Sequence, residues 1–443
     1  MKKIYMILAA ALVAASFSAQ AENAWGLQGS GTEADPYQIS TAADLLAIAN
    51  NITADNKGTG EYFKMMNDID MNGAACPSIA KAGITNVTTV TYGFNGTFDG
   101  NSKTITGINH TANGNDEAGK FNSVFSAIDE NGVVKNLIIG GKNTISAYNY
   151  TAGVASLCKG TIEDCINYAD ITGSNAFAAG ICGYVIRATG KIKNCVNYGN
   201  IKAMTYACGI CGGTQAFSGA NYAYEISGNI NYGNLSTTNG VGSSGIIGVF
   251  TNGILKNNTN YGNADDSNGK ATSRLYTAGI VANLTCFQEM TDNVNSGEIK
   301  GIKYVGGIVG SVAKNTSIPV TSLVISGNTN EGAVSGDLNV AGIVGNTTQA
   351  QDVVTIANCT NRGVVTCTDT ATVGNLRGNS LIALGEGNVI AAGLTRYSLD
   401  PVATGITEVS ATKATKARKV IENGQIFIIA GDKKYNLMGV EVK

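Results

Sequence analysis

Residues 192–212 read IKNCVNYGNIKAMTYACGICG, and three short features of this stretch recur along much of the chain. They are an apolar run, an Asn-x-Gly turn and a Gly-Ile segment. Between Asn167 and Asn361 the turn recurs about every 32 residues. Such self-similarity is typical of a solenoid, in which each repeat forms one coil. The copies are Asn197-Tyr198-Gly199, Asn231-Tyr232-Gly233, Asn260-Tyr261-Gly262, Asn295-Ser296-Gly297, Asn330-Glu331-Gly332 and Asn361-Arg362-Gly363, after a degenerate Asn167-Tyr168-Ala169.

The Gly-Ile segment recurs in phase with the turn, so each repeat has three short apolar runs separated by Gly and Asn. The runs are too short and too Gly-rich for helices, and propeller blades would need antiparallel hairpins. The pattern predicts an all-β fold, a right-handed three-sided parallel β-helix with Ile and Val inside and stacked Asn side chains. The copies begin at Ala179, Cys208, Ser244, Ala278, Gly306 and Ala341.

These repeats resemble the GLUG-type repeats of bacterial surface β-helix proteins, which have a pectin-lyase-like fold. The resemblance covers roughly residues 26–366. It implies a parallel β-helix and an adhesin-like surface protein, and it implies no specific activity. Outside the repeats it rests on Gly29-Ser30-Gly31-Thr32, Asp35-Pro36-Tyr37-Gln38-Ile39, Tyr62-Phe63-Lys64, Asn67-Asp68-Ile69-Asp70 and Phe94-Asn95-Gly96-Thr97-Phe98-Asp99-Gly100-Asn101.

Residues 1–21 have a charged start, a short apolar run and an Ala-x-Ala cleavage site, which together indicate a secretory signal peptide. No later segment is apolar enough to predict a membrane span. The chain carries 30 basic and 32 acidic residues, so it has no basic excess and nucleic acid is a poor partner. We expect a monomer, secreted or on the outer-membrane surface of a Gram-negative bacterium.

We expect caps at the two ends of the solenoid, because an open coil exposes unpaired backbone groups. Residues 41–51 predict a short amphipathic helix over the N-terminal core opening, since Thr41 and Asp44 resemble a capping box. The expected segments are 22–135 for the N-terminal cap and first coils, 136–366 for the repeats and 367–402 for a C-terminal coil or cap.

The C-terminal end has a different composition. Residues 403–419 are rich in Ala, Thr and Lys and indicate a linker. Residues 420–443 predict two strands around a turn. With the upstream Thr404-Gly405-Ile406-Thr407, this small β tail resembles the C-terminal sorting tails of type IX secretion cargo.

The residues that could carry catalysis are sparse. His110 is the only histidine, and we interpret it as an exposed loop residue rather than part of a triad. Asp68 and Asp70 alternate along a predicted strand and are interpreted as structural. The coil carboxylates fall at unlike repeat phases: Asp164, Asp170, Glu225, Glu298 and Asp337. Asp265-Asp266 is interpreted as one loop pair. We therefore predict no catalytic residues, no metal site and no cofactor.

The ten cysteines of this exported chain invite a disulfide framework, but their phase favours another interpretation. Cys165, Cys195 and Cys359 each lie two residues before the Asn of a turn, and Cys182 and Cys211 share one position of the Gly-Ile segment. Residues in equal phase stack, so we expect small apolar side chains in interior files. One or two disulfides remain an alternative.

Four tyrosines share the middle position of consecutive turns: Tyr168, Tyr198, Tyr232 and Tyr261. Corner residues point outward, so we expect a column about 15 Å long. Spaced aromatic faces suit sugar rings; the alternative is that the rings only stabilise the corner. The favoured function is a non-catalytic, adhesin-like protein that binds a glycan or an extracellular-matrix ligand. The alternatives are a polysaccharide lyase or glycoside hydrolase on the same scaffold, and a purely architectural spacer.

Overall fold

The structure is a computed structural model. It describes residues 23–401 except for 76, 88, 112–113, 116–118, 187–188, 216–223, 240, 269–274 and 315–319, together with the backbone of three strands between residues 418 and 436. The chain divides into two compact units at residue 400. The expected signal peptide at 1–21 and nearly all of the expected linker at 403–419 lie outside the described residues.

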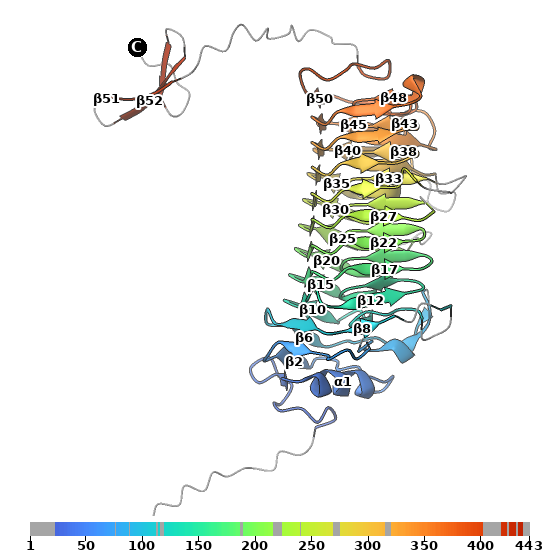
Figure 1. The fold of residues 1–443 in the computed structure, drawn as a ribbon, viewed down its shortest axis with the longest axis vertical. Coiled ribbons are helices and arrows are strands. Elements are labelled where there is room, and N and C mark those ends of the chain that lie inside the picture. The colour runs from blue at the N-terminus through green and yellow to red at the C-terminus, as the bar shows by residue number, and fades with distance from the viewer. Residues whose placement is uncertain are drawn as a thin grey trace, which may run out of the picture. The chain divides into compact units, whose positions relative to one another are not determined.

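The first unit is a parallel β-solenoid, which confirms the fold that the repeat predicts (Figure 1). Five sheets run along it, and neighbouring strands in each sheet come from successive coils. Sheet 1 consists of β1 (Tyr37–Ile39), β2 (Tyr62–Met65), β6 (Thr97–Asp99), β10 (Val133–Lys135), β15 (Thr161–Glu163), β20 (Lys191–Lys193), β25 (Tyr224–Ser227), β30 (Gly253–Lys256), β35 (Glu289–Thr291), β40 (Leu323–Ser326), β45 (Val354–Ala357) and β49 (Ala383–Leu384).

Sheets 2 and 3 follow sheet 1 around each coil. Sheet 2 consists of β3 (Ile69–Asp70), β7 (Thr104–Thr106), β11 (Ile138–Ile139), β16 (Ile166–Asn167), β21 (Val196–Asn197), β26 (Ile230–Asn231), β31 (Thr259–Asn260), β36 (Val294–Asn295), β41 (Thr329–Asn330), β46 (Thr360–Asn361) and β50 (Val389–Ile390). Sheet 3 consists of β8 (Asn109–His110), β12 (Thr144–Ala147), β17 (Ile171–Gly173), β22 (Ile201–Ala203), β27 (Leu235–Thr237), β32 (Ala264–Asp265), β37 (Ile299–Lys300), β42 (Val334–Gly336) and β47 (Val365–Cys367).

Sheets 4 and 5 complete each coil. Sheet 4 consists of β13 (Thr151–Ala152), β18 (Phe177–Ala179), β23 (Tyr206–Cys208), β28 (Gly242–Ser244), β33 (Tyr276–Ala278), β38 (Lys303–Gly306), β43 (Leu338–Ala341) and β48 (Val373–Gly374). Sheet 5 consists of β9 (Phe125–Ile128), β14 (Ala155–Cys158), β19 (Cys182–Val185), β24 (Cys211–Gly213), β29 (Ile247–Thr251), β34 (Val281–Cys286), β39 (Val309–Val312) and β44 (Val344–Thr347). A small antiparallel pair, β4 (Ile84–Asn86) with β5 (Thr89–Val90), follows the 3₁₀ turn η1 (Lys81–Gly83), and a second such turn, η2 (Thr370–Thr372), precedes β48.

A typical coil has five short strands because two of the three expected runs are each divided by a corner. The run at 192–196 bends at Asn194, whose φ of +54° lies in the left-handed region that Asn and Asp tolerate. A second corner, at Gly209 and Ile210, separates β23 from β24, and a Cβ at Gly209 would collide with the carbonyl oxygen of Gly245 in the next coil. In other coils the residue at this first corner also has a left-handed backbone conformation; these residues are Asn136, Asp164, Asn257, Asp292 and Asn358.

Buried Asn side chains connect the coils, as the turn predicts. Asn231, for example, donates from Nδ2 to the carbonyl of Gly233 at 2.9 Å and to Oδ1 of Asn260 in the next coil at 2.8 Å. The series of bonds ends at Asn375, which is in register with Gly342 rather than with the turns; Asn375 accepts from Asn361 and donates to the carboxylate of Asp400 at 2.8 Å. This inner Asn file consists of Asn167, Asn197, Asn231, Asn260, Asn295, Asn330, Asn361 and Asn375.

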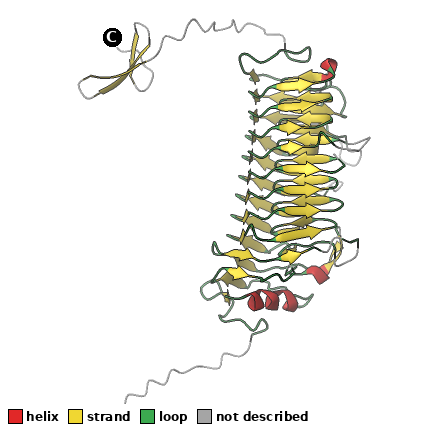
Figure 2. Cartoon of the chain, in the orientation of Figure 1, coloured by secondary structure: helices red, strands yellow, loops and turns green. Residues whose placement is uncertain are grey.

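The N-terminal helix is confirmed as α1 (Ala42–Asn51), which lies at the end of the solenoid beside β2 (Figure 2). Thr41 caps it, and the Thr41 and Asp44 side chains form the predicted capping box. Leu45 and Ile48 are fully buried and belong to the same apolar core as the first coils. The helix therefore shields the core at this end.

The second unit contains three antiparallel strands where two were expected: β51 (Arg418–Glu422), β52 (Gln425–Ala430) and β53 (Lys433–Asn436). The extra strand, β51, begins inside the segment expected to be linker.

We expect Asn260→Ala to destabilise the solenoid by about 2–3 kcal/mol, because it leaves buried partners of the inner Asn file without hydrogen bonds. Asn263→Ala is the matched control, because Asn263 is exposed and water can replace its contacts. Urea unfolding followed by circular dichroism measures both. Equal midpoints for the two variants would show that the file is not a major source of stability.

Candidate functional site

The four predicted tyrosines form one column on the outside of the solenoid. Their ring centroids are 4.8, 4.9 and 5.0 Å apart, and adjacent ring planes are within 10° of parallel. Each of these residues is 43–49% exposed. Backbone bonds fix the alignment, since the Tyr198 and Tyr232 N–H groups each donate to the carbonyl of the turn Asn one coil earlier at 2.7 Å. We call Tyr168, Tyr198, Tyr232 and Tyr261 the tyrosine column.

The spacing decides which parts of the column a ligand can reach. At about 5 Å the inner ring faces cover one another, so no sugar ring fits between them. The outer face of Tyr168 has no ring beside it, because Gly140 occupies the equivalent position in the preceding coil. At the other end of the column, Ser296 occupies the position equivalent to Tyr261 in the next coil. A ligand can therefore contact the ring edges, the hydroxyls and the two end faces.

A polar turn row accompanies the column. Its members are Asp170, Asn200, Asn234 and Asn263, each two residues after a column tyrosine. Their side chains accept a hydrogen bond from the backbone N–H of the equivalent residue one coil later; for example, the Asn200 N–H donates to Asp170 at 2.7 Å. The same contact joins Asn200 to Asn234 and Asn234 to Asn263, both at 3.1 Å. All four residues are exposed and retain capacity for further hydrogen bonds.

A first cavity, about 490 Å³ in volume, opens beside this row on the outer surface of sheet 3. It is lined by the turn row and by β17, β22, β27 and β32. Thr172, Lys202, Ser236 and Asp265 are the partly or fully exposed side chains of these strands, whereas the neighbouring residues point into the core. The lining is therefore a mixture of hydroxyl, amide and charged groups.

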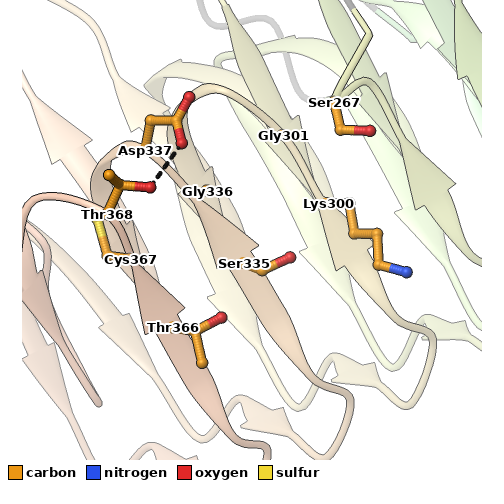
Figure 3. A pocket seen from close by; sticks show the side chains of 9 residues that line it. All are labelled: Ser267, Lys300, Gly301, Ser335, Gly336, Asp337, Thr366, Cys367 and Thr368. Atoms are coloured by element: carbon orange, nitrogen blue, oxygen red, sulfur yellow. Dashed lines mark hydrogen bonds between the residues drawn. The ribbon is translucent and has the colours of Figure 1, made fainter.

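A second cavity, about 430 Å³ in volume, lies on the same sheet over β37, β42 and β47 (Figure 3). Lys300, Ser335 and Thr366 come from these successive strands, and Asp337 accepts a hydrogen bond from the Thr368 hydroxyl at 2.8 Å. Lys300 also lies 2.9 Å from Glu298, and this hydrogen-bonded contact raises the pKa of Lys300. Apart from small residues at alternating positions, no sequence pattern predicts either cavity.

The linings do not assemble the groups that glycoside cleavage needs. Asp170 and Asp265 line the first cavity from strands three spacings apart, which separates them by about 14 Å along the axis. Paired carboxylates in glycosidases are about 5–9.5 Å apart. In the second cavity burial raises the pKa of Cys367, so its thiol stays protonated at neutral pH.

The remaining carboxylates singled out in the sequence have structural partners. Asp68 accepts a hydrogen bond from the Thr104 N–H and Asp70 accepts one from the Asn72 N–H, both at 2.8 Å, in agreement with the structural interpretation.

The interpretation of His110 as an exposed loop residue is wrong. His110 lies in β8, half-buried and aligned with Ile145, because β8 extends sheet 3 beyond β12.

Asp266 is a buried carboxylate that the sequence interpretation left in a loop pair. It is 2% exposed and accepts from the N–H and hydroxyl of Thr237 at 2.9 and 2.7 Å. It also accepts from the N–H and hydroxyl of Ser243 at 2.9 and 2.8 Å, and from the Thr277 hydroxyl at 3.1 Å. Burial raises the pKa of Asp266, although the bonds from Thr237 and Ser243 partly oppose that shift.

The described cysteines singled out in the sequence lie in interior files as predicted, but one of these files is not purely apolar because it also contains buried Asn side chains. Cys165, Cys195 and Cys359 are fully buried, and their position is occupied in the intervening coils by the buried Asn229, Asn258, Asn293 and Asn328. Cys182 and Cys211 are direct partners in adjacent strands. Every described cysteine is a free thiol, and Cys76 lies outside the described residues. Burial raises the pKa of Cys359 to about 11.

The described part of the chain has neither a metal-binding cluster of side chains nor a membrane-spanning helix. None of its groups of three or more His, Cys, Asp or Glu side chains is placed to hold a metal ion. None of its helices is long and apolar enough to span a membrane.

Comparisons with known proteins give partial matches. No family model matches the chain, so the GLUG-type resemblance stays a prediction. A 153-residue stretch is 31% identical to "Halomucin" of Haloquadratum walsbyi, and a 124-residue stretch is 33% identical to a "Putative Gly-rich membrane protein" of Evansella cellulosilytica. These stretches are 33% and 28% of this chain but only 2% and 13% of those proteins.

One solved structure is similar over most of the chain. It is described as a "putative immunoglobulin A1 protease" from Bacteroides ovatus, with 17% sequence identity and a TM-score of 0.35. The match covers 87% of this chain and 83% of that one. At this level of similarity it contributes nothing to the functional argument.

We expect the pH dependence of stability to reveal the buried charge of Asp266. Because its pKa is raised on folding, its contribution is most favourable below the unfolded pKa, about 3.9, and is lost as pH rises through the folded pKa. The stability of wild type relative to Asp266→Asn should therefore fall between acidic and neutral pH, as measured by urea midpoints. Asp265→Asn, which changes the exposed neighbouring carboxylate, is the control. If the stability of wild type relative to Asp266→Asn rose with pH instead, the raised pKa of Asp266 would be contradicted.

We expect the buried thiols to resist alkylation in the folded protein, since reaction requires an accessible thiolate. In a Cys76→Ser background at mildly alkaline pH, where part of the Cys367 thiol ionises, mass spectrometry should find iodoacetamide only on this half-buried residue before unfolding and on all nine described cysteines after it. Cys367→Ser should remove the native label. If two cysteines stayed unlabelled after the protein was unfolded without reductant, they would instead be joined in a disulfide.

Proposed function

We propose that this chain is a secreted or cell-surface, adhesin-like protein that binds a glycan and does not cleave it. The observation that carries the proposal is the file of exposed tyrosine edges and hydroxyls beside the polar turn row. Tyr combines an apolar body with a polar tip, and carboxamides offer both donors and acceptors. Sugars present the complementary combination of C–H surfaces and hydroxyls.

An extracellular location is consistent with three features. The first 21 residues have the pattern of an export leader. The relatives carry the names of a halomucin and a membrane protein. Residues 420–443 resemble a type IX sorting tail, from which we infer the outer surface of a Gram-negative bacterium.

The non-catalytic part of the proposal is supported by the separation of Asp170 from Asp265 and by the protonated thiol of Cys367. A long row of equivalent polar side chains suits binding, because each coil can add a weak contact to the same ligand.

A glycan array probed with the purified mature protein should give a defined set of bound glycans. Replacing all four column tyrosines by Ser should abolish that binding, because it removes every ring edge and hydroxyl. Replacement by Phe keeps the stacked rings and should give an intermediate loss if the hydroxyls contribute.

The matched control is the double variant Tyr276→Ser and Tyr304→Ser, which removes a stacked pair from sheet 4. Thermal melting verifies that each variant is folded. An array without bound glycans, or unchanged binding by the folded four-Ser variant, would reject the proposed function.

A further inference from the structure

The two cavities belong to a single row of outward side chains that runs along sheet 3. Thr172 is in register with Lys202, and Lys202 with Ser236. The next strands continue the row, because Leu235 pairs with Ala264 and Asp265 with Lys300. The row ends at Ser335 and Thr366, which are also in register. Its members are Thr172, Lys202, Ser236, Asp265, Lys300, Ser335 and Thr366.

We propose that this row is the floor of an axial binding track for an extended, neutral, hydroxyl-rich polymer, namely a polysaccharide that lies parallel to the solenoid axis. This inference rests on the proposed function and specifies its ligand class and direction. The polar turn row forms one rim of the track and separates it from the tyrosine column.

The direction follows from the shape of the cavities. The first cavity is lined by four successive strands of sheet 3 and the second by the next three, with Ser267 after β32 in its wall. Each cavity therefore crosses several successive strands and runs in the direction of the solenoid axis. From β17 to β47 there are six strand spacings, so the track is about 29 Å long. A single sugar unit occupies only a small part of that length.

The depth of the track follows from side-chain size. In the second cavity the outward residues that follow Lys300 along the row are the small Ser335 and Thr366, which leave space above the sheet (Figure 3). Lys300 lies at the β37 end of this cavity, and Asp337 lies at its margin. The hydroxyls of Ser335 and Thr366 can donate to and accept from a polymer that lies in this space.

The charge of the track selects a neutral polymer. Lys202 shares the first lining with Asp170 and Asp265, and Lys300 shares the second with Asp337, so the two signs are interspersed and an acidic polymer gains no net attraction. Lys300 is moreover held by Glu298 at 2.9 Å. A neutral ligand exchanges hydrogen bonds with such groups, and its binding is insensitive to salt.

The test measures the affinity of neutral glucose, xylose and mannose oligomers by calorimetry, from the monosaccharide to chains longer than the track. Affinity should increase with length and level off only when a chain spans both cavities. It should not change with salt. Oligogalacturonides of the same lengths, the acidic series, should bind more weakly.

Two variants block the track separately. Ser236→Trp fills the first cavity and Ser335→Trp the second, and both side chains point away from the core. Each variant should lower the affinity of the longest bound oligomer about tenfold or more, to the level of a short one. Val324→Trp is the control, because Val324 is an exposed residue on sheet 1.

The outcomes separate the two proposals. If glycans bind and the four-Ser variant loses them, while affinity is independent of length and both Trp variants behave as wild type, the track is rejected and the proposed function stands. Preference for the acidic series with strong salt dependence also rejects the track. If no oligomer or arrayed glycan binds, both proposals fail.

Discussion

A carboxamide buried away from water must find all its partners inside the protein, and the inner Asn file meets this demand only when successive coils are in register. A slip of one residue would exchange inward and outward side chains along the strand. In the turn it would expose Asn231 and bury Tyr232. The stacking of the tyrosines, the polar turn row and the outward row of sheet 3 all depend on this alignment.

The features that repeat with the coil were predictable from the sequence. The recurring Asn-x-Gly turn predicts the stacked amides and the tyrosine column, and equal phase predicts the buried position of Cys165 and Cys195. The five-strand coil was not predictable, because a single left-handed residue such as Asn194 divides a run without changing its apolar pattern. Asp266 was missed because its partners come from two coils, and His110 was misplaced because β8 lies before the regular repeats.

The surface was less predictable than the core for a physical reason. Core positions are restricted to apolar or fully bonded side chains, and this restriction leaves a periodic pattern. The outward row from Thr172 to Thr366 has no such restriction, so hydroxyl and charged residues of both signs alternate without a recognisable motif. Only the registers of sheet 3 show that these residues form one line. The ring spacing likewise limits ligand contact to edges and ends, which a position in the sequence does not reveal.

The way the inner Asn file ends at Asp400 has a consequence for how proteins of this kind change length. A repeat gained by duplication between two interior coils would receive a donor from one neighbour and offer one to the other, so every amide would remain bonded. Asn375 accepts from Asn361 in place of a turn Asn of the next coil, so a repeat added after Asn361 would compete with Asn375 and displace the segment that closes the end. Growth and shortening by whole coils are thus tolerated in the middle of the array, while the terminal coils are fixed.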